Sequence, residues 1–443
     1  GTWFHQLRGR AARSRRDHCE TMPLPSLIEV EPFSAAQLEA FKELKARIVV
    51  PGSKSITNRA IVLAALGDAT VTLRGALWSE DTQAMTDCMQ RLGIKTDVAP
   101  DPDVESNRII TVLGCAGKIP HGGTEASPLE LFVANAGTAA RFLTAMCCLG
   151  GGVYRLSGVP RMHERPQREL IRALRALGYQ IDTPNEMLPA VVHGGGPRPG
   201  DVTVSVDDSS QFASALLLSS TRGGWRVSTP EGANPDELPY VEMTRRMLET
   251  FPHSGGEFQV EPDASSASYF HAINALFPAV APVEVMACQP PRSEGGSGWQ
   301  IDAEFPRHMP TRSIVASTRA AVGNASPDDV DDASDKRRKT TQLVSRKTDL
   351  GDSVMTAIAI APLAASAFTF TSLGVLRKQE CERVQALRDE LTKCGATVVE
   401  SGDSLEVTPS ARAADLGKAT ARTYHDHRMA MCLATLATAV GGI

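Results

Sequence analysis

The sequence predicts an α/β protein of about two domains, each built from similar helix–strand units. A chain of 443 residues is too long for a single ordinary hydrophobic core. Four segments carry apolar residues at the spacing of a one-sided helix, and in three of them a glycine ends the helix before an alternating strand. These glycines are Gly93, Gly178 and Gly395. The four segments are residues 80–98, 165–182, 239–251 and 379–399.

A second set of helices is almost entirely apolar after the first turn, which predicts burial on all sides. These helices are expected at residues 55–67, 138–150, 209–220, 265–277, 353–365 and 427–440. Each predicted unit therefore pairs one buried helix with one surface helix, and strands lie between them. Similar units in series predict an array of packed α/β layers.

Composition and patterning exclude several classes of protein. A net charge of −5 argues against a general nucleic-acid surface. The apolar run at residues 355–367 is too short for a membrane span and contains Pro362. The nine cysteines lack metal-like spacing and indicate buried thiols in a reducing compartment. His163 and His427 also lack partners at metal-ligand spacing.

Two charged segments are expected outside the packed units. Residues 1–27 are rich in arginine and predict a basic tail or linker, or else the remnant of a transit peptide. The expected location is cytoplasmic, or a plastid if the second explanation holds. Residues 328–347 carry an acidic block and then a basic one, which predicts a solvated surface loop rather than a binding patch.

Cations stand at the starts of several predicted helices, where the helix dipole disfavours them. They are Lys54, Arg59, Arg141, Arg165 and Arg428. One explanation is ordinary capping by serine, with the cations pointing into water. The other is that these helix starts converge on one cleft and form a cradle for a polyanion. The repetition of the feature along the chain favours the cradle.

Six short motifs occur in order from about Ile28 to the C-terminus. They are PGSKSITNRA, NAGTAARFLTA, HERPQREL, SSQFASALL, DASSASYF and TYHDHRMAM. Together they resemble the enolpyruvyl transferases, and among these the EPSP synthases. The stretches IEVEPF and RKQECERV further resemble the EPSP synthase part of the fungal-type pentafunctional AROM polypeptide. Fusion to other shikimate-pathway domains is therefore a further expectation.

The resemblance implies a two-domain enolpyruvyl transferase fold. Each domain would contain three βαβαββ-type units around buried parallel helices. The chain would cross twice between the domains, near residues 51–54 and near residues 262–263. Domain 1 would then be discontinuous, with residues 28–52 and 263–443, and domain 2 would hold residues 53–262.

The resemblance also implies a reaction with two small-molecule substrates. Phosphoenolpyruvate and shikimate 3-phosphate would give 5-enolpyruvylshikimate 3-phosphate and phosphate, without a metal or an organic cofactor. Both substrates are polyanions, so a dehydrated cleft needs several cations to offset their repulsion. The acceptor hydroxyl must lose a proton while the methylene carbon gains one, which calls for positioned acids and bases. No nucleic-acid or membrane partner is expected.

Motif positions carry the family's functional residues onto this sequence. Shikimate 3-phosphate would be held by Lys54, Ser55, Arg59, Ser209, Ser210, Gln211 and Asp352. Phosphoenolpyruvate would be held by Lys54, Gly137, Arg165, Gln211, Arg383 and Arg428. Asp352 would be the base for the hydroxyl, Glu380 the second proton-transfer group, and Lys54 would lie between the substrates. Without the resemblance, Asp352 reads as a helix cap and Glu380 with Arg383 as a surface pair.

Five departures from the family pattern bear on turnover. Gln379 stands where the family has a catalytic lysine, and Val375 replaces an asparagine. Glu237 replaces a serine near a phosphate, and Ala134 replaces a glycine. The chain also stops at Ile443, before the region of a late family lysine. Two alternatives follow: the sister activity on UDP-N-acetylglucosamine, or a fragment that binds ligand with impaired catalysis.

Overall fold

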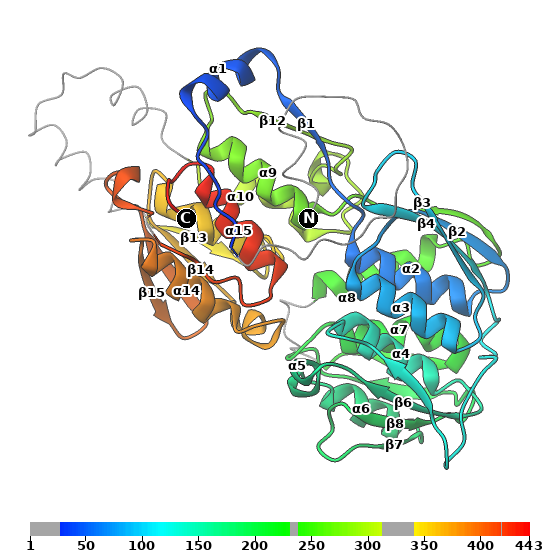
Figure 1. Cartoon of the computed structure of the whole chain (residues 1–443). Coiled ribbons are helices and arrows are strands. Elements are labelled where there is room, and N and C mark those ends of the chain that lie inside the picture. Colours follow the sequence, from blue (N-terminus) through cyan, green and yellow to red (C-terminus); the bar gives the residue numbers. More distant parts are fainter. Residues whose placement is uncertain (1–26, 231–237, 312–340, 418) are drawn as a thin grey trace, which may run out of the picture.

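The computed structural model describes residues 27–230, 238–311, 341–417 and 419–443, which form two lobes of helices and sheets (Figure 1). The predicted α/β class is confirmed. Three four-stranded sheets repeat one topology, in which a parallel pair is followed by two antiparallel strands. Their strand orders are β11-β2-β4-β3, β5-β6-β8-β7 and β13-β14-β16-β15. The internal repeat predicted from the sequence is therefore present in the strand pairing.

The strands have the following bounds. The first sheet contains β2 (Thr70–Leu77), β3 (Thr96–Pro100), β4 (Asn107–Leu113) and β11 (Gly256–Gln259). The second contains β5 (Leu129–Phe132), β6 (Val153–Ser157), β7 (Gln180–Asp182) and β8 (Ala190–His193). The third contains β13 (Gln342–Ser345), β14 (Phe368–Thr371), β15 (Thr397–Ser401) and β16 (Ser404–Thr408). Parallel two-stranded sheets pair β1 (Ala46–Val49) with β12 (Val283–Met286), and β9 (Gly200–Thr203) with β10 (Trp225–Ser228).

The four predicted one-sided helices are present as α3 (Glu80–Arg91), α6 (Arg168–Ala176), α8 (Leu238–Thr250) and α14 (Arg383–Lys393). The predicted glycine stops are also confirmed. Gly93, Gly178 and Gly395 follow these helices with φ of +82°, +88° and +89°. A residue with a side chain is strained in this left-handed conformation, so glycine ends the helix there at the lowest cost.

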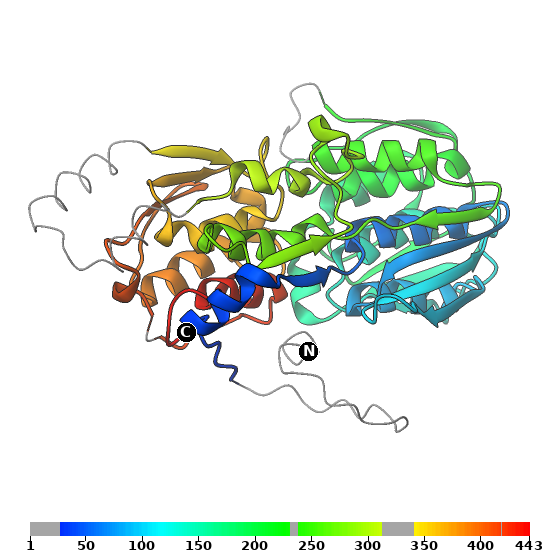
Figure 2. The same ribbon diagram turned by 90° about the horizontal axis from the view of Figure 1, so that it is seen from above.

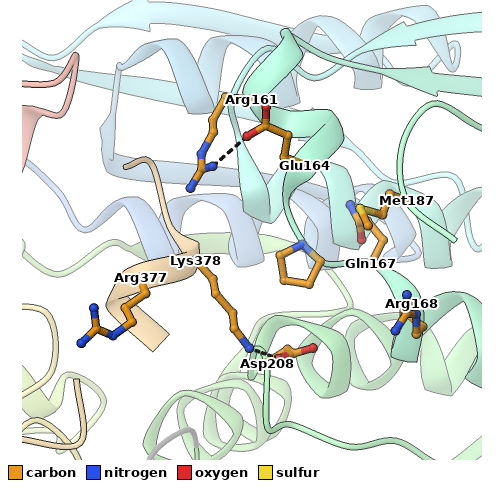
Figure 3. A pocket seen from close by; sticks show the side chains of 9 residues that line it. Arg161, Glu164, Gln167, Arg168, Met187, Asp208, Arg377 and Lys378 are labelled. Carbon is orange, nitrogen blue, oxygen red and sulfur yellow. Dashed lines mark hydrogen bonds and ion pairs between the residues drawn. The ribbon is translucent and has the colours of Figure 1, made fainter. Parts of the chain in front are cut away.

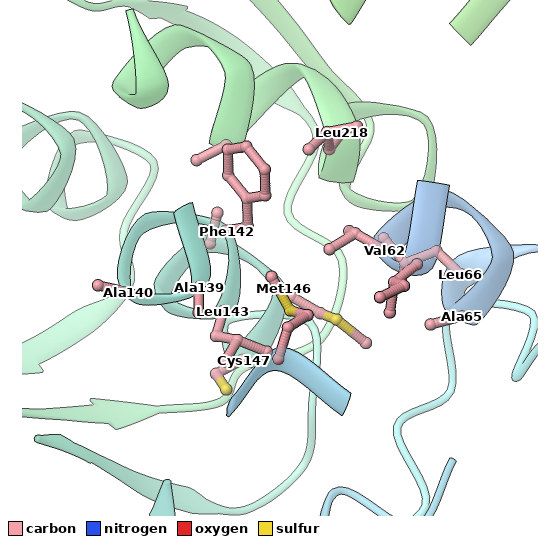
Figure 4. Packing of buried hydrophobic residues seen from close by; sticks show 14 of the residues in the cluster. Val62, Ala65, Leu66, Ala139, Ala140, Phe142, Leu143, Met146, Cys147 and Leu218 are labelled. Atoms are coloured by element: carbon pink, nitrogen blue, oxygen red, sulfur yellow. The ribbon is translucent and has the colours of Figure 1, made fainter. Parts of the chain in front are cut away.

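All six predicted apolar helices are present. They are α2 (Lys54–Leu66), α4 (Gly137–Cys147), α7 (Gln211–Gly223), α9 (Ala264–Leu276), α13 (Val354–Ile360) and α15 (His427–Ala437). Helices α2, α4 and α7 pack together in one core, where Val62, Phe142, Leu143 and Leu218 meet (Figure 4). Helices α9, α13 and α15 pack in a second core. Burial on every side explains why these helices carry almost no polar residues.

The remaining helices are short and connect the layers. They are α1 (Ala35–Glu43), α5 (Pro160–Glu164), α10 (Phe305–His308) and the 3₁₀ turns η3 (Arg292–Glu294), η4 (Ile301–Glu304), η5 (Ala361–Leu363), η6 (Gly374–Lys378) and η7 (Ala413–Asp415). Helix α1 begins with a capping box between Ser34 and Gln37. It lies beside the second lobe (Figure 2) because the rings of Phe33 and Phe41 meet edge-to-face and Phe33 packs on Phe277.

Two chain segments run side by side between the two cores. Ser53 N donates to Glu261 O at 2.8 Å, and Asp263 N donates to Pro51 O at 2.8 Å. Gly52 lies between them, and a Cβ at this position would overlap the carbonyl oxygen of Gly75. The segments coincide with the predicted crossings. The assignment of residues 28–52 plus 263–443 and residues 53–262 to two domains stays a prediction.

Two of the predicted segments, the basic tail and the charged loop, lie only partly within the described residues. The predicted basic tail falls, up to residue 26, outside the described residues, as do residues 328–340 of the predicted charged loop. The prediction is wrong for the end of that loop, because residues 342–345 form β13 and Val344 is buried against the second core. The eight described cysteines are free thiols. No helix in the described ranges has the length and apolar character needed to cross a membrane.

Candidate active site

Lys54 begins α2 and points toward two carboxylates from distant parts of the chain. Its Nζ lies 3.0 Å from Asp81 Oδ2 and 3.9 Å from Glu380 Oε1. Burial lowers the pKa of the ammonium, but Asp81 and Glu380 outweigh burial and raise the pKa above its usual value. Ser53 is the N-cap residue and makes no side-chain capping bond. Simple capping with Lys54 in water is therefore wrong for this helix.

From Glu380 a continuous series of ion pairs leads to the start of α15. Glu380 Oε2 lies 2.8 Å from Arg383 Nη2, and Arg383 Nη1 lies 3.7 Å from Asp352 Oδ2. Asp352 Oδ2 in turn lies 3.5 Å from Arg428 Nη2. Including Lys54, five residues predicted for the site are thus linked from four separate parts of the sequence. The Glu380–Arg383 pair is not a surface pair, because Arg383 is only 1% exposed.

Asp352 is surrounded by three guanidinium groups. Besides Arg383 and Arg428, Arg346 Nη2 lies 3.1 Å from Asp352 Oδ1. Burial raises the pKa of the carboxyl, but Arg428, Arg346 and Arg383 outweigh burial and hold it well below its usual range. Asp352 is also no helix cap, because Ser353 is the N-cap of α13. Asp352 therefore stays ionised in this arrangement.

Glu380 is likewise held ionised. Burial raises the pKa of its carboxyl, but Arg383, Arg165 and Lys54 outweigh burial and keep it well below its usual range. Asp426 binds Arg383, the arginine that pairs with Glu380. It accepts from Arg383 Nε at 2.7 Å and caps α15 by accepting from Arg428 N at 2.8 Å. Asp426 thereby holds the guanidinium of Arg383 and the backbone of Arg428, two of the four cations that the sequence assigns to phosphoenolpyruvate.

Two guanidinium groups meet at the start of α4, beside Gly137. A Cβ at this position would lie 2.7 Å from Arg165 Nη2 and even closer to Arg141 Nη1. Arg141 donates to Pro166 O at 2.6 Å and Arg165 to Asn135 O at 2.7 Å. Neither forms an ion pair with a carboxylate of the described chain. Burial and the charge of Arg165 hold the pKa of Arg141 well below its usual value.

The proximity of Arg141 and Arg165 favours an anion beside Gly137. Two like charges in a buried place repel each other and lose hydration, so an anion placed between them is strongly favoured. The absence of a side chain at Gly137 keeps that place open. The Nε atoms of both Arg141 and Arg165 are buried without a hydrogen-bond partner in the described structure. The predicted cradle is therefore most complete here.

Arg59 is 1% exposed and its guanidinium is held by neutral groups. It donates to Thr244 Oγ1 at 2.7 Å, to Ser214 Oγ at 3.0 Å and to Ser55 O at 3.0 Å. Burial lowers the pKa of Arg59 to about 10. Arg59 contributes positive charge beneath Ser55, but its donors are already engaged, which argues for support of the site rather than for direct contact.

The predicted SSQ motif lies at the start of α7. Ser209 Oγ accepts from Gln211 N at 3.2 Å, and Ser210 is buried. Gln211 Oε1 accepts from Arg141 Nη1 at 3.4 Å. The motif is therefore joined to the Arg141–Arg165 pair, as its assignment to both substrates requires. Of the departures noted in the sequence, Glu237 lies outside the described residues.

Gln379 and Lys378 lie at the mouth of the site and face different ways. Gln379 Oε1 accepts from Arg383 Nη1, whereas Lys378 Nζ pairs with Asp208 (Figure 3). Lys378, Arg161 and Asp208 line a cavity of about 330 Å³. The Lys378 ammonium is therefore engaged by Asp208, and the described chain shows no ion pair between Lys378 and Glu380.

Sequence reasoning missed three charged residues that complete the site. Asp81 was not singled out within its predicted helix, yet it pairs with Lys54. Arg346 fell in the segment predicted to be a solvated loop, and this prediction is wrong, since Arg346 is 2% exposed and pairs with Asp352. Asp426 was noted only as part of a motif. In the described chain, no group of three or more His, Cys, Asp or Glu side chains is arranged to hold a metal ion.

Comparison with known proteins bears on what this arrangement does. The chain matches the family model for EPSP synthase (3-phosphoshikimate 1-carboxyvinyltransferase) over residues 38–443. A relative from Opitutus terrae named 3-phosphoshikimate 1-carboxyvinyltransferase is 36% identical over 439 residues, covering 94% of this chain and 90% of the relative. One of the same name from Laribacter hongkongensis is 35% identical over 427 residues, covering 90% and 91%.

Solved structures share the fold. EPSP synthase from Acinetobacter baumannii superposes with a TM-score of 0.61 at 20% identity, covering 94% of this chain and 92% of that one. The enolpyruvyl transferase NikO from Streptomyces tendae gives a TM-score of 0.52 at 13% identity, covering 90% and 89%. The predicted two-lobed enolpyruvyl transferase fold is thus confirmed. With the match over residues 38–443, these findings show that the chain belongs to the EPSP synthase family.

Proposed function

We propose that this chain transfers the carboxyvinyl group of phosphoenolpyruvate to shikimate 3-phosphate, giving 5-enolpyruvylshikimate 3-phosphate and phosphate. The observation that carries the proposal is the series of ion pairs from Lys54 through Glu380, Arg383 and Asp352 to Arg428. These are the groups that the motif positions assign to the two substrates. The family match favours shikimate 3-phosphate over UDP-N-acetylglucosamine as the acceptor.

Phosphoenolpyruvate fits the place between the two lobes. Its phosphate suits the open position at Gly137, where Arg165 lacks a carboxylate partner. Its carboxylate suits Arg383 and Arg428, since a guanidinium fork binds a carboxylate in two places. Lys54 lies toward both groups and offsets the charge of the second substrate. Each of these contacts replaces hydration that the closed site excludes.

Shikimate 3-phosphate is assigned to the neighbouring surface. Ser55, Ser209 and Ser210 would donate to its phosphate at the starts of α2 and α7, where backbone N–H groups also favour an anion. Gln211 would contact both substrates. Arg59 donates to the carbonyl oxygen of Ser55 and supplies positive charge next to it. Asp352 would face the acceptor hydroxyl.

The proposed chemistry uses Asp352 and Glu380 as proton-transfer groups. The acceptor oxygen forms a bond to the central carbon of phosphoenolpyruvate while its proton leaves toward Asp352. The methylene carbon gains a proton through Glu380, whose carboxylate is ionised without ligand and must first take up that proton from solvent. The tetrahedral product then loses phosphate as the new methyl group returns a proton. Positioned acids and bases of this kind contribute about a hundred- to ten-thousandfold in rate.

Substrate binding would also tune Asp352. Without ligand, Arg383 and Arg428 stabilise its ionised form. When the carboxylate of phosphoenolpyruvate takes up these two cations, they stabilise Asp352 less and its pKa rises toward a more useful value for a base. The base is then strongest when the second substrate is in place, which favours productive turnover.

The remaining assignments are made on the same footing. We assign residues 28–52 with 263–443 and residues 53–262 to two domains that close on the substrates, without a metal or an organic cofactor. Impaired catalysis is the second candidate, and the side chain of Gln379 favours it, because it cannot supply a proton. A cytoplasmic location follows from the pathway, with a plastid as the alternative. Fusion to other shikimate-pathway domains has the AROM-like stretches in its support.

Phosphate release from phosphoenolpyruvate tests the proposal. The assay is run with both substrates, with each one omitted, and with UDP-N-acetylglucosamine in place of shikimate 3-phosphate. We expect release only when phosphoenolpyruvate and shikimate 3-phosphate are both present. Release that depends on UDP-N-acetylglucosamine instead would overturn the assignment, and binding of shikimate 3-phosphate without any release would identify the impaired form.

A further inference from the structure

Two buried polar side chains lie outside the ion-pair cluster, at the 3₁₀ turn η4. Gln300 and Asp302 are each 6% exposed, although amide and carboxylate groups are rarely placed in the interior. Neither belongs to the groups that hold the substrates or move protons in the proposed reaction. Their partners show what they connect.

Gln300 binds one of the two segments that run between the lobes. Its Oε1 accepts from Ala264 N at 3.0 Å, and its Nε2 donates to Glu261 Oε2 at 3.0 Å and to Pro262 O at 2.9 Å. The amide thus uses its acceptor and its donors on residues 261–264. This segment enters α9 from the first core.

Asp302 binds the loop that carries Asp352. Its Oδ1 accepts from Ser353 N at 2.7 Å, and its Oδ2 accepts from Ser265 Oγ at 2.7 Å. Ser265 lies in the first turn of α9, directly after the segment that Gln300 holds. One carboxylate therefore ties the residue next to Asp352 to the start of α9.

The same loop is confined from its other side. A Cβ at Gly351 would lie 2.9 Å from Asp302 Oδ2 and 2.7 Å from Tyr240 Oη. The backbone of residues 351–353 is therefore held between Asp302 and Tyr240, with little room to shift. Hydrogen bonds to an ionised carboxylate are among the stronger ones in proteins, so Asp302 limits where Asp352 points.

We propose that Asp302 is the positioning residue for Asp352, and that the turn from Gln300 to Asp302 couples the segment between the lobes to the base. This inference rests on the proposed role of Asp352 in the transfer reaction. A movement of residues 261–264 during closure is passed through Gln300 and Asp302 to the backbone of Ser353. The base then reaches its working position together with the closed form.

A double-mutant cycle on kcat tests this link, because a residue that acts only by placing a carboxylate adds nothing once the carboxylate is gone. Asp302→Ala is expected to lower kcat about ten- to a hundredfold, with KM for phosphoenolpyruvate within about threefold of the starting value. Asp352→Asn lowers kcat further, and the double variant is expected to match Asp352→Asn alone. Losses that multiply in the double variant would overturn the proposal.

Matched variants separate positioning from folding. Glu304→Ala removes a partly exposed acid from the same turn and is expected to leave kcat unchanged. Asp302→Asn keeps an oxygen that accepts from Ser353 N, so it should retain more of kcat than Asp302→Ala. If Asp302→Ala fails to fold, Asp302→Asn and Ser265→Ala carry the test. A folded Asp302→Ala protein with full kcat would refute the positioning role.

A second readout does not need turnover. If the unchanged chain releases no phosphate, the proposed function has failed, and hydrogen exchange then tests the link itself. Asp302→Ala should speed exchange at the amide of Ser353, while the amide of Arg346, which donates to Thr371 O at 3.1 Å, stays protected. Unchanged exchange at Ser353 would show that Asp302 does not hold this loop.

Discussion

Arg59 and Arg383 are both 1% exposed, yet they are stabilised in opposite ways. Arg59, from α2, donates only to hydroxyl and carbonyl oxygens, and burial lowers its pKa to about 10. Arg383, from α14, contacts the carboxylates of Asp426 and Glu380, which outweigh burial and raise its pKa above its usual value. The first arginine keeps its positive charge unbalanced, whereas the second has it neutralised within the protein.

The same contrast extends across the two sides of the site. Arg141 and Arg165, like Arg59, have no carboxylate partner in the described chain, whereas Arg346 and Arg428 both contact Asp352. Within residues 53–262, Arg59, Arg141 and Arg165 thus present uncompensated cations, whereas Lys54 pairs with Asp81 and Glu380. The site cations of residues 263–443 already hold carboxylates. An anion gains most by binding the first side, while on the second it must take cations from Asp352 and Glu380. This difference separates binding from activation of the base.

The largest effect should come from breaking the neutralised side. Asp426→Asn removes the 2.7 Å partner of the buried Arg383 and leaves Glu380 at 2.8 Å, so the loss of unfolding free energy should approach about 3–5 kcal/mol, the value for a fully broken buried pair. Chemical denaturation measures this loss. Asp415→Asn, which removes the exposed partner of Arg412, is the matched control and should leave the denaturation midpoint unchanged. An Asp426→Asn protein as stable as the control would remove the distinction between the two sides.

The pH dependence sharpens the same point. The pKa values of Asp426, Glu380 and Asp352 lie below their usual values, so their stabilising effect is complete above about pH 4 and fades as pH falls further. The stability difference between the unchanged chain and Asp426→Asn should therefore shrink as the pH is lowered from about 5 to about 2, the range in which these carboxylates gain protons. Denaturation curves over this range measure it. A difference that grows toward acid would contradict the assignment.

The uncompensated side should respond through binding instead. Arg165→Ala removes charge-assisted contacts worth roughly 1.5–3 kcal/mol, so use of phosphoenolpyruvate should fall about ten- to a hundredfold in kcat/KM. Stability should change little, because Arg165 has a like-charged neighbour and no acid to lose. Arg168→Ala, on the adjacent exposed turn, serves as the control. Unfolding of Arg165→Ala with binding intact would mean that this arginine is structural.

A smaller effect is expected from the departure at position 379. Gln379→Lys places a proton donor and a positive charge beside Glu380, and kcat should rise by at least about tenfold. Phosphate release measures the change. Lys378→Ala is the control, because its ammonium pairs with Asp208. Loss of activity in Lys378→Ala with no gain from Gln379→Lys would show that Lys378 is the working lysine.

The smallest effect is expected at Ala134, the residue before Asn135, whose carbonyl oxygen accepts from Arg165. Ala134 has φ of +48°, a conformation that strains residues with a side chain, and the family pattern has glycine here. Ala134→Gly relieves the strain but adds freedom to the unfolded chain, so we expect a net gain of at most about 1 kcal/mol. Thermal melting measures it. A clear loss of stability would mean that the Ala134 methyl group packs usefully.

Local features of the fold were predictable because they depend on neighbouring residues. Helix ends at Gly93, Gly178 and Gly395 follow from their left-handed backbone, and the apolar helices follow from composition alone. Strand pairing was not predictable, since β11 pairs with β2 although most of the sequence of the first lobe separates the two strands. The strand β13 was missed because its four residues lie between charged segments, and only packing against β14 defines it.

The site divides along the same line. Residues within motifs, such as Lys54 and Arg428, were identified because the motifs retain their order along the chain. Asp81 was missed because only the folded chain brings the start of α3 to Lys54. Arg346 was missed because its segment was predicted to be a solvated loop, although Asp352 follows only six residues later. A charge run in sequence shows how many cations are present, and only the folded chain shows which of them lack an acid.

Calorimetric titration of shikimate 3-phosphate into the unchanged chain, followed by phosphoenolpyruvate, tests the central claim most directly. The unbalanced cations of residues 53–262 predict that shikimate 3-phosphate binds alone and that the affinity falls as salt is raised. They also predict that phosphoenolpyruvate binds to the resulting complex, and that Arg165→Ala weakens this second step. A folded chain that binds neither anion at low salt would contradict the account.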